Sequence, residues 1–203
     1  MKYRNTRLQL RSWIHDTIAS VLTPTSFAID ATAGNGHDTL FLAQHITAKE
    51  HIYAFDIQSQ AIQRTSQRLH EHTLLHTTTL FTIGHETMIA TLDFHTKGNI
   101  PLCDAILFNL GYLPHSTKKC ITQARTTCCA LSQALQLLAL HGILSIHTYH
   151  GHAGGYEEYQ HILAWSKRLS TQEYHVFTLE QQNKKSHHEV VFFIQKVRET
   201  THD

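Results

Sequence analysis

Polar side chains that could bind a ligand stand directly after three apolar runs of the sequence. Asp30 follows "SFAI", Asp56 follows "HIYAF" and Asn109 follows "DAILF". Short apolar runs bounded by turn signals predict buried strands, and open parallel sheets bind their ligands beyond the carboxyl ends of the strands. We therefore expect these three side chains to line one ligand-binding edge of a sheet.

The segment "IDATAGNGHDT" gives the strongest local signal in the chain. Gly34 and Gly36 follow Asp30 and precede Thr39, which we expect to enter a helix. Glycines at such a turn let the backbone bend tightly and approach a ligand closely. The alternative is an ordinary glycine-containing turn between a strand and a helix. The residues of this loop that we expect to bind a cofactor are Asp30, Gly34, Asn35, Gly36, His37, Asp38 and Thr39.

The pattern D-x-x-x-G-x-G resembles the cofactor loop of class I S-adenosylmethionine (SAM) methyltransferases. Dinucleotide binding is a poorer match, because Thr39 stands where G-x-G-x-x-G has its third glycine. Asp56 lies 22 positions after the first loop glycine, close to where an acidic residue binds a ribose diol. A solvated residue at a strand end is the alternative for Asp56. Gln58 could reach the ribose or adenine, and Gly84 and His85, after the next strand, could contact adenine.

Asn109 ends the fourth expected strand, which lies beside the first strand at the point where the strand order reverses. Its side chain could hold the N–H hydrogens of an amine and aim the nitrogen lone pair at a methyl donor. The sequence "NLGY" looks like a variant of the tetrapeptide of methyltransferases that act on amino groups, with Tyr112 packing on the substrate. We interpret Asn109 as a clamp that also borders the cofactor, and a plain turn residue is the alternative.

The segment "HTYHGHAGG" brings further polar side chains to the same edge of the sheet. We expect Tyr149, His150 and His152 to face the cleft, where the histidines could bind substrate or remove a proton, and His147 to point the opposite way. A metal site is the alternative, since H-x-x-H-x-H has suitable ligand types. No acidic residue stands close by in the sequence to complete a ligand set, so we expect no metal.

The wider pattern alternates strands with helices, which predicts a mostly parallel, doubly wound α/β sheet. The last two strands are joined by a link so short that they must be antiparallel. We expect one domain over 1–203, with an N-terminal helix within 1–24 and a Rossmann-like core over 25–203. The predicted strands are 26–34, 51–57, 78–84, 103–110, 142–150, 174–181 and 189–196, and the predicted helices are 5–22, 37–46, 59–72, 119–140 and 154–169, with 85–98 unassigned.

Composition and charge narrow the class of protein. The net charge is only +1, so a nucleic-acid binder of this sequence would need a local basic patch. The four cysteines contain no C-x-x-C pair, and the N-terminus shows no apolar signal segment. We expect a soluble, cytoplasmic protein without a membrane partner. The oligomeric state stays open, with a homodimer among the alternatives.

Four blocks, "IDATAGNGHDTLFLA", "AFDIQ", "FNLGYLP" and "YHGH", closely resemble the YtqB-like putative rRNA methylases, which include MnmM-type tRNA methyltransferases. The resemblance implies a class I SAM-dependent methyltransferase fold with a seven-stranded sheet, helices on both faces and SAM as cofactor. It implies as substrate the aminomethyl group of 5-aminomethyl-(2-thio)uridine at the wobble position, in the anticodon stem-loop of tRNA. The catalytic candidates are then Asn109, Tyr112, His150 and His152, and the substrate-side or phosphate-contacting candidates are Tyr112, Leu113, Pro114, Tyr149, Lys118, Lys119, Lys184 and Lys185.

Other functions are alternatives to this one. The methyl acceptor could be another RNA, such as rRNA, or a small amine. An NAD-dependent oxidoreductase would share the strand–loop–helix motif, but the missing third glycine and the terminal hairpin argue against it. A non-catalytic RNA-binding module that kept the cofactor loop would bind RNA without transferring a methyl group.

Overall fold

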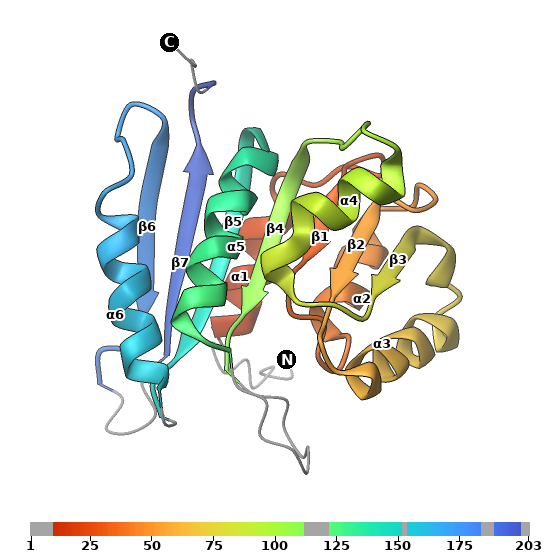
Figure 1. The fold of residues 1–203 in the computed structure, drawn as a ribbon, viewed down its shortest axis with the longest axis horizontal. Coiled ribbons are helices and arrows are strands. Elements are labelled where there is room, and N and C mark those ends of the chain that lie inside the picture. The colour runs from red at the N-terminus through yellow and green to blue at the C-terminus, as the bar shows by residue number, and fades with distance from the viewer. Residues whose placement is uncertain (1–9, 112–121, 152–153, 184–188, 200–203) are drawn as a thin grey trace, which may run out of the picture.

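The computed structural model describes residues 10–111, 122–151, 154–183 and 189–199. Within these ranges the strands form one seven-stranded sheet in the order β3-β2-β1-β4-β5-β7-β6 (Figure 1). The first five strands pair in parallel, and β7 runs antiparallel to both of its neighbours. The strands are β1 (Ala28–Asp30), β2 (Ile52–Phe55), β3 (Thr78–Phe81), β4 (Cys103–Asn109), β5 (Leu138–Tyr149), β6 (Tyr174–Glu180) and β7 (Glu189–Lys196).

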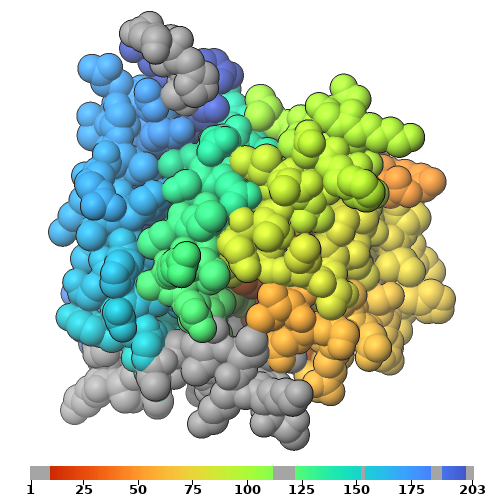
Figure 2. Space-filling model, viewed as in Figure 1, coloured from red at the N-terminus to blue at the C-terminus, as the bar shows by residue number. Residues whose placement is uncertain are grey.

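Helices cover both faces of the sheet. One face packs against α4, α5 and α6, whose side chains cover it closely in Figure 2, and the other packs against α1, α2 and α3. Neighbouring residues of a strand point to opposite faces, so Ile106 of β4 joins the first core and Leu107 joins the second. The helices are α1 (Leu10–Ala19), α2 (His37–His45), α3 (Ser59–Glu71), α4 (Met88–Thr96), α5 (Ala124–Leu137) and α6 (Gly155–Ser166), with short 3-10 turns η1 (Leu75–Thr77) and η2 (His85–Thr87).

The predicted α/β class, the strand order around β1 and the terminal antiparallel hairpin are confirmed. This order places β1 and β4 side by side at the centre of the sheet, with β2 and β3 continuing to one side and β5 to the other. The ends of β1, β2 and β4 therefore meet at one edge. No helix in the described ranges is long and apolar enough to cross a membrane.

The predicted helix over 119–140 is wrong at its C-terminal end. α5 ends at Leu137, and β5 begins at the next residue, Leu138, which pairs with Cys103 of β4. The pairing shifts register just after this point, and His141 takes a positive φ of 67° there. The apolar spacing of the helix continues into the strand, so the periodicity alone does not show where the helix stops.

Two further segments differ from the sequence-based assignment. The strand expected over 26–34 ends at Asp30, because the residues after it turn sharply toward α2. The unassigned residues 85–98 form η2 and α4. Met88 and Leu92 of α4 are buried whereas Phe94 is exposed, so its apolar residues do not follow one clean stripe.

Candidate functional site

Asp30 holds the glycine loop through hydrogen bonds to residues on both sides of the glycines. Its buried carboxylate accepts a 2.6 Å hydrogen bond from the Thr39 hydroxyl and a 3.1 Å hydrogen bond from the Thr32 backbone N–H. Burial raises the pKa of Asp30 to about 7, and the nearby charge of Asp38 adds to the shift. Both carboxylate oxygens serve the loop itself, so Asp30 positions the expected cofactor residues from within.

The two loop glycines adopt left-handed backbone conformations, with φ of 55° at Gly34 and 75° at Gly36. A Cβ at Gly36 would lie 2.8 Å from the Cα of Thr65 in α3. This distance is shorter than real Cβ contacts, and the obstacle is backbone rather than a flexible side chain. Gly36 is therefore needed both for the turn and for the close approach of the loop to α3.

Two arginines of α3 donate hydrogen bonds to the loop, and neither was among the residues predicted for the site. Arg64 donates a 3.0 Å hydrogen bond to the side-chain oxygen of Asn35, and Arg68 donates a 2.7 Å bond to its backbone oxygen. Burial, with the charge of Arg68 next in weight, lowers the pKa of His37. The i, i+4 spacing of Arg64 and Arg68, which places them on one helix face, is the only sequence signal that they contact the loop.

Asp56 connects the second strand to the same loop. Its Oδ2 accepts a 3.0 Å hydrogen bond from the Gly34 N–H, and its Oδ1 accepts a 2.8 Å bond from the Gln58 N–H. Partial burial raises the pKa of Asp56, while these two bonds oppose the rise. Each carboxylate oxygen keeps a second lone-pair direction, so the group can also accept hydrogens from a diol.

His85 presents an acceptor atom without a partner in the described part of the chain. Its side chain is only 9% exposed, and its Nδ1 lies 3.2 Å from the backbone oxygen of Ala31. Since that oxygen can only accept, Nδ1 carries the hydrogen and Nε2 is the acceptor of the neutral ring. Nε2 is buried and makes no hydrogen bond among the described residues. Burial lowers the pKa of His85, which keeps the ring neutral and suited to accept from an amine.

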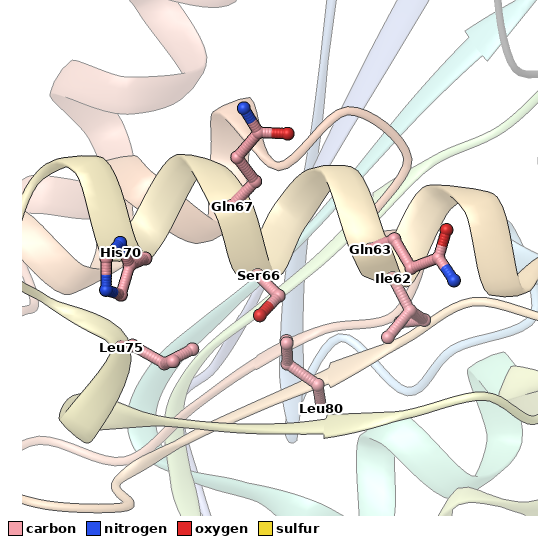
Figure 3. A pocket seen from close by; sticks show the side chains of 7 residues that line it. All are labelled: Ile62, Gln63, Ser66, Gln67, His70, Leu75 and Leu80. Atoms are coloured by element: carbon pink, nitrogen blue, oxygen red, sulfur yellow. The ribbon is translucent and has the colours of Figure 1, made fainter.

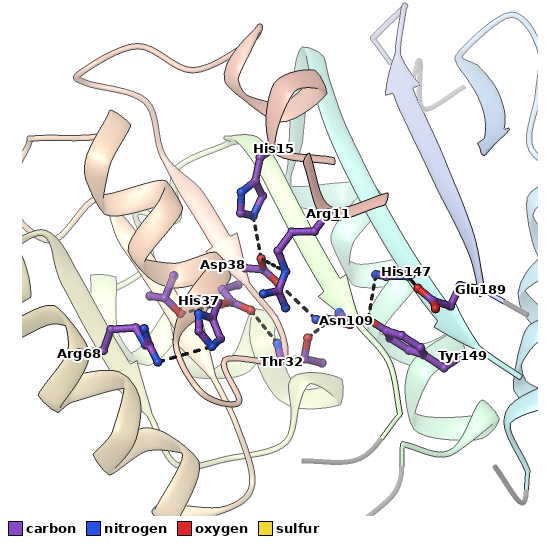
Figure 4. Close-up of polar contacts among 12 residues, drawn as sticks. Arg11, His15, Thr32, His37, Asp38, Arg68, Asn109, His147, Tyr149 and Glu189 are labelled. Atoms are coloured by element: carbon purple, nitrogen blue, oxygen red, sulfur yellow. Dashed lines mark hydrogen bonds and ion pairs between the residues drawn. The ribbon is translucent and has the colours of Figure 1, made fainter. Parts of the chain in front are cut away.

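Asn109 joins the fourth strand to the loop through two hydrogen bonds (Figure 4). Its backbone N–H donates to the Thr32 hydroxyl at 2.6 Å, and its side-chain Nδ2 donates to Asp38 Oδ2 at 3.4 Å. Asp38 also meets α1, since His15 Nε2 lies 2.9 Å and Arg11 Nε 4.0 Å from its Oδ1. Burial opposes ionisation of Asp38, but the hydrogen bond from His15 and the charge of Arg11 outweigh it and lower its pKa.

The expected orientations along the end of β5 need a correction. His147 and Tyr149 share one face of the strand, and their rings lie 4.3 Å apart. The His150 ring instead packs 4.0 Å from the Tyr159 ring of α6, on the opposite face. Asn109 lies beside Tyr149 (Figure 4), so His147, rather than His150, lies on the side of Asn109.

An acidic partner for His147 comes from another strand. Glu189, the first residue of β7, places its Oε2 at 3.1 Å from His147 Nε2, and His147 Nδ1 lies 3.1 Å from the Tyr149 hydroxyl (Figure 4). The Tyr149 hydroxyl also points toward the side chain of Asn109 (Figure 4). Burial, and then the charge of Glu189, raise the pKa of Tyr149, so its hydroxyl stays protonated. The expectation that no acidic group stands near these histidines held only for the linear sequence.

Glu158 ties the start of the loop after β4 to two helices. The Gly111 N–H donates to the Thr122 hydroxyl, and Thr122 donates in turn to Glu158 Oε2 at 2.8 Å. The other oxygen of Glu158 accepts a 2.6 Å hydrogen bond from Thr127 of α5. Glu158 is only 3% exposed, although it lies in the first turn of α6.

Several expected site residues lie outside the described ranges. These residues are Tyr112, Leu113, Pro114, Lys118, Lys119, His152, Lys184 and Lys185.

Among the residues that are described, no group of three or more His, Cys, Asp or Glu side chains could hold a metal ion.

A groove of about 460 Å³ lies elsewhere, between α3 and the edge strand β3 (Figure 3). None of the expected cofactor residues lines this groove, and its polar side chains belong to one exposed helix face. It is therefore separate from the strand-end site. Its lining residues are Ile62, Gln63, Ser66, Gln67, His70, Leu75 and Leu80.

Comparisons with known proteins show which family the chain is similar to. A model of the family described as "Putative rRNA methylase" matches residues 52–195. The chloroplastic tRNA (mnm(5)s(2)U34)-methyltransferase of Arabidopsis thaliana is 32% identical over 163 residues, which are 76% of this chain. The match covers 58% of that relative, so the chain spans less than two thirds of its length.

Solved structures are similar to nearly the whole chain. The crystal structure of a putative rRNA-methylase from Clostridium thermocellum is 31% identical with a TM-score of 0.87, covering 94% of this chain and 99% of that one. A putative methyltransferase from Streptococcus mutans, solved in complex with S-adenosylhomocysteine (SAH), is 32% identical with a TM-score of 0.81 and the same coverage. The chain thus has the class I SAM-dependent methyltransferase fold.

Proposed function

The chain belongs to the family of putative rRNA methylases, and from this premise we propose that it is a SAM-dependent N-methyltransferase. Its substrate is the aminomethyl group of 5-aminomethyl-(2-thio)uridine at the tRNA wobble position, and its product is the 5-methylaminomethyl derivative. The observation that carries the proposal is the placement of the Asn109 amide beside the glycine loop, at the point where the strand order reverses. An amide at this place suits an amine acceptor, because it offers a hydrogen-bond acceptor without a strong base.

The residues at this edge fit SAM as the cofactor. Asp56 has remaining lone pairs for a ribose diol, and the buried Nε2 of His85 offers an acceptor for the exocyclic amine of adenine. Gly34 and Gly36 leave the loop backbone open to a ligand, since neither carries a side chain. When bound, SAM supplies a methyl group activated by a positively charged sulfur.

The side chains of the site position an amine rather than ionise it. The carbonyl oxygen of Asn109 accepts an N–H hydrogen of the neutral amine and aims the nitrogen lone pair toward the cofactor side. Asp38 accepts a hydrogen bond from the Asn109 amide group, and the Tyr149 hydroxyl lies beside the same group. Positioning and exclusion of water then provide most of the rate acceleration.

The RNA part of the proposal rests on relatives and on a chemical requirement. The Arabidopsis relative is described as a tRNA (mnm(5)s(2)U34)-methyltransferase, whose product carries a methylated amine on a wobble uridine. The proposed phosphate contacts are Lys118, Lys119, Lys184 and Lys185, which stand in the sequence after β4 and between β6 and β7. Ribosomal RNA is a second candidate, favoured by the description of the matching family.

Methyl transfer to defined RNAs tests the function. The purified chain is incubated with SAM and tRNA that carries 5-aminomethyl-2-thiouridine, and nucleosides are analysed by mass spectrometry. We expect the wobble nucleoside to gain one methyl group, and no gain in a matched tRNA whose uridine lacks the aminomethyl group. Transfer to rRNA but not to the amine-bearing tRNA would replace the proposed substrate, and transfer to neither would refute both RNA substrates.

A further inference from the structure

Three titratable side chains from two strands form a chain of contacts that ends at Asn109. Glu189 contacts His147, His147 contacts Tyr149, and the Tyr149 hydroxyl points toward Asn109 (Figure 4). The strand registers bring them together, because His147 pairs with Asn109 of β4 and Tyr149 pairs with Glu189 of β7. His147 is only 6% exposed, so these contacts are sheltered from solvent.

The donors and acceptors in this chain have one consistent direction. The Glu189 carboxylate can only accept, so the hydrogen of a neutral His147 ring lies on Nε2. The other nitrogen, Nδ1, is then an acceptor, and the Tyr149 hydroxyl donates to it at 3.1 Å. With its hydrogen committed to His147, the Tyr149 oxygen is left to accept from its other neighbour, Asn109.

The same assignment of hydrogen-bond donors and acceptors fixes the orientation of the Asn109 amide. Asp38 accepts from Asn109 Nδ2 at 3.4 Å, and the second hydrogen of this NH2 group is available to the Tyr149 oxygen beside it. Two acceptors on its donor side hold the amide so that its carbonyl oxygen points to neither of them. If Tyr149 were free to turn, its hydroxyl could donate to that carbonyl and occupy the acceptor that an amine needs.

We propose that Glu189 and His147 are positioning residues, which set the direction of the Tyr149 hydroxyl and thereby present the Asn109 carbonyl to the substrate amine. The inference rests on the proposed function for the identity of the substrate. Neither residue touches the reacting atoms, so both act through Tyr149. A purely structural role, such as joining β5 to β7, would affect stability without affecting the methyl-transfer step.

Single-turnover methylation of amine-bearing tRNA separates these roles. We expect Glu189→Leu and His147→Leu to lower the methyl-transfer rate by about tenfold or more at saturating SAM and tRNA, because the reacting amine loses its positioning. SAM affinity should stay within about twofold of wild type. The double variant should be no slower than either single variant, since both act through the same hydroxyl.

Conservative and control variants sharpen the test. Glu189→Gln keeps a carbonyl acceptor for His147 Nε2 and should stay within about threefold of the wild-type rate. Glu180→Leu removes a carboxylate from the other strand of the same hairpin and should leave the rate unchanged. An unchanged rate in Glu189→Leu would overturn the proposal, and so would an equal loss of rate and SAM affinity in all variants.

A measurement independent of activity keeps the inference separate from the proposed function. Nitrogen chemical shifts of the His147 ring, assigned by comparison with His147→Leu, report which nitrogen carries the hydrogen. We expect the Nε2–H form in wild type at neutral to mildly alkaline pH, and a change in Glu189→Leu. A hydrogen on Nδ1 in wild type would overturn the inference even if methyl transfer occurs, whereas absence of methyl transfer with the Nε2–H form would count only against the proposed function.

Discussion

Asn109 is engaged through both its backbone and its side chain. The backbone bond joins the last residue of β4 to Thr32 in the loop after β1, and the side-chain bond joins it to Asp38 of the expected ligand site. The two roles predicted for this residue can thus coexist, and substitution separates them. A turn role depends on the backbone preferences of the new residue, whereas a clamp role depends on its acceptor oxygen.

We expect Asn109→Ala to keep most of the SAM affinity and to lower methyl transfer by a factor on the order of a hundred, because the amine loses its positioning. Asn109→Asp retains an acceptor oxygen but places a second charge beside Asp38, so it should keep partial activity, above that of the alanine variant. Single-turnover rates and SAM titration check both variants. Near wild-type transfer by Asn109→Gly would show that the residue serves only the turn.

Asp30 makes the stability of the ligand-free protein depend on pH. Its pKa is raised to about 7, above the ordinary value of 3.8, because of burial and the nearby Asp38 charge. Between these two values the folded chain holds a proton on Asp30 that the unfolded chain has released. The contribution of Asp30 to the free energy of unfolding therefore falls as pH rises through this window, by up to about 1.4 kcal/mol per pH unit.

Asp30→Asn should remove this slope, since an amide remains neutral and still offers an acceptor to Thr39 or Thr32. Relative to wild type, the variant should gain stability toward neutral pH. Urea unfolding of both proteins at several pH values from about 4 to 8 measures the difference. Parallel stability curves would show that the buried carboxyl does not hold its proton in the folded state.

The junction between the glycine loop and α3 depends on the missing side chain of Gly36. Gly36→Ala adds a Cβ 2.8 Å from the Thr65 Cα at a positive φ, so α3 or the loop must move. Gly98→Ala is a matched control, because Gly98 has a similar φ of 84° with no atom within 4 Å of the added Cβ. We expect about 1 kcal/mol of destabilisation in the control from the backbone alone, and a larger loss in Gly36→Ala.

SAM binding distinguishes the two glycine variants further. Displacement of the loop should also move the Gly34 N–H away from Asp56, so Gly36→Ala should weaken SAM binding while Gly98→Ala does not. Thermal unfolding and SAM titration of both variants check this. Equal effects of the two substitutions would show that only the positive φ matters at position 36.

The sequence could predict those helices and strands whose apolar residues follow one clear spacing. The strands on either side of β1 are continuous apolar runs, so their order and the ligand edge could be inferred. The end of α5 could not, because Leu138 fits the helical spacing as well as it fits β5. The contact of Glu189 with His147 joins residues 42 positions apart, and no local pattern encodes such a pairing.

At the scale of the whole molecule, the net charge does not indicate which surface would bind RNA. The net charge of +1 cannot attract a polyanion over the entire surface, so binding must depend on a local patch. The lysines that we propose as phosphate contacts stand in the segments after β4 and between β6 and β7. Both segments follow or precede strand ends at the edge where Asn109 and Glu189 lie. A patch there would place the RNA backbone around the reactive amine.

Neutralising Lys118, Lys119, Lys184 and Lys185 together to Gln should weaken tRNA binding and flatten its salt dependence, by a slope of roughly 0.7–0.9 per lost phosphate contact. The slope reports released counterions, so it separates phosphate contacts from a general loss of structure. SAM affinity should not change.

As a control, neutralising Lys167 and Arg168, which follow the C-terminal end of α6, should leave the slope unchanged. The measurement is tRNA affinity at several salt concentrations. An unchanged slope in the quadruple variant would place the phosphate contacts elsewhere on the molecule, and a lower slope in the control would show that the charge acts without regard to position.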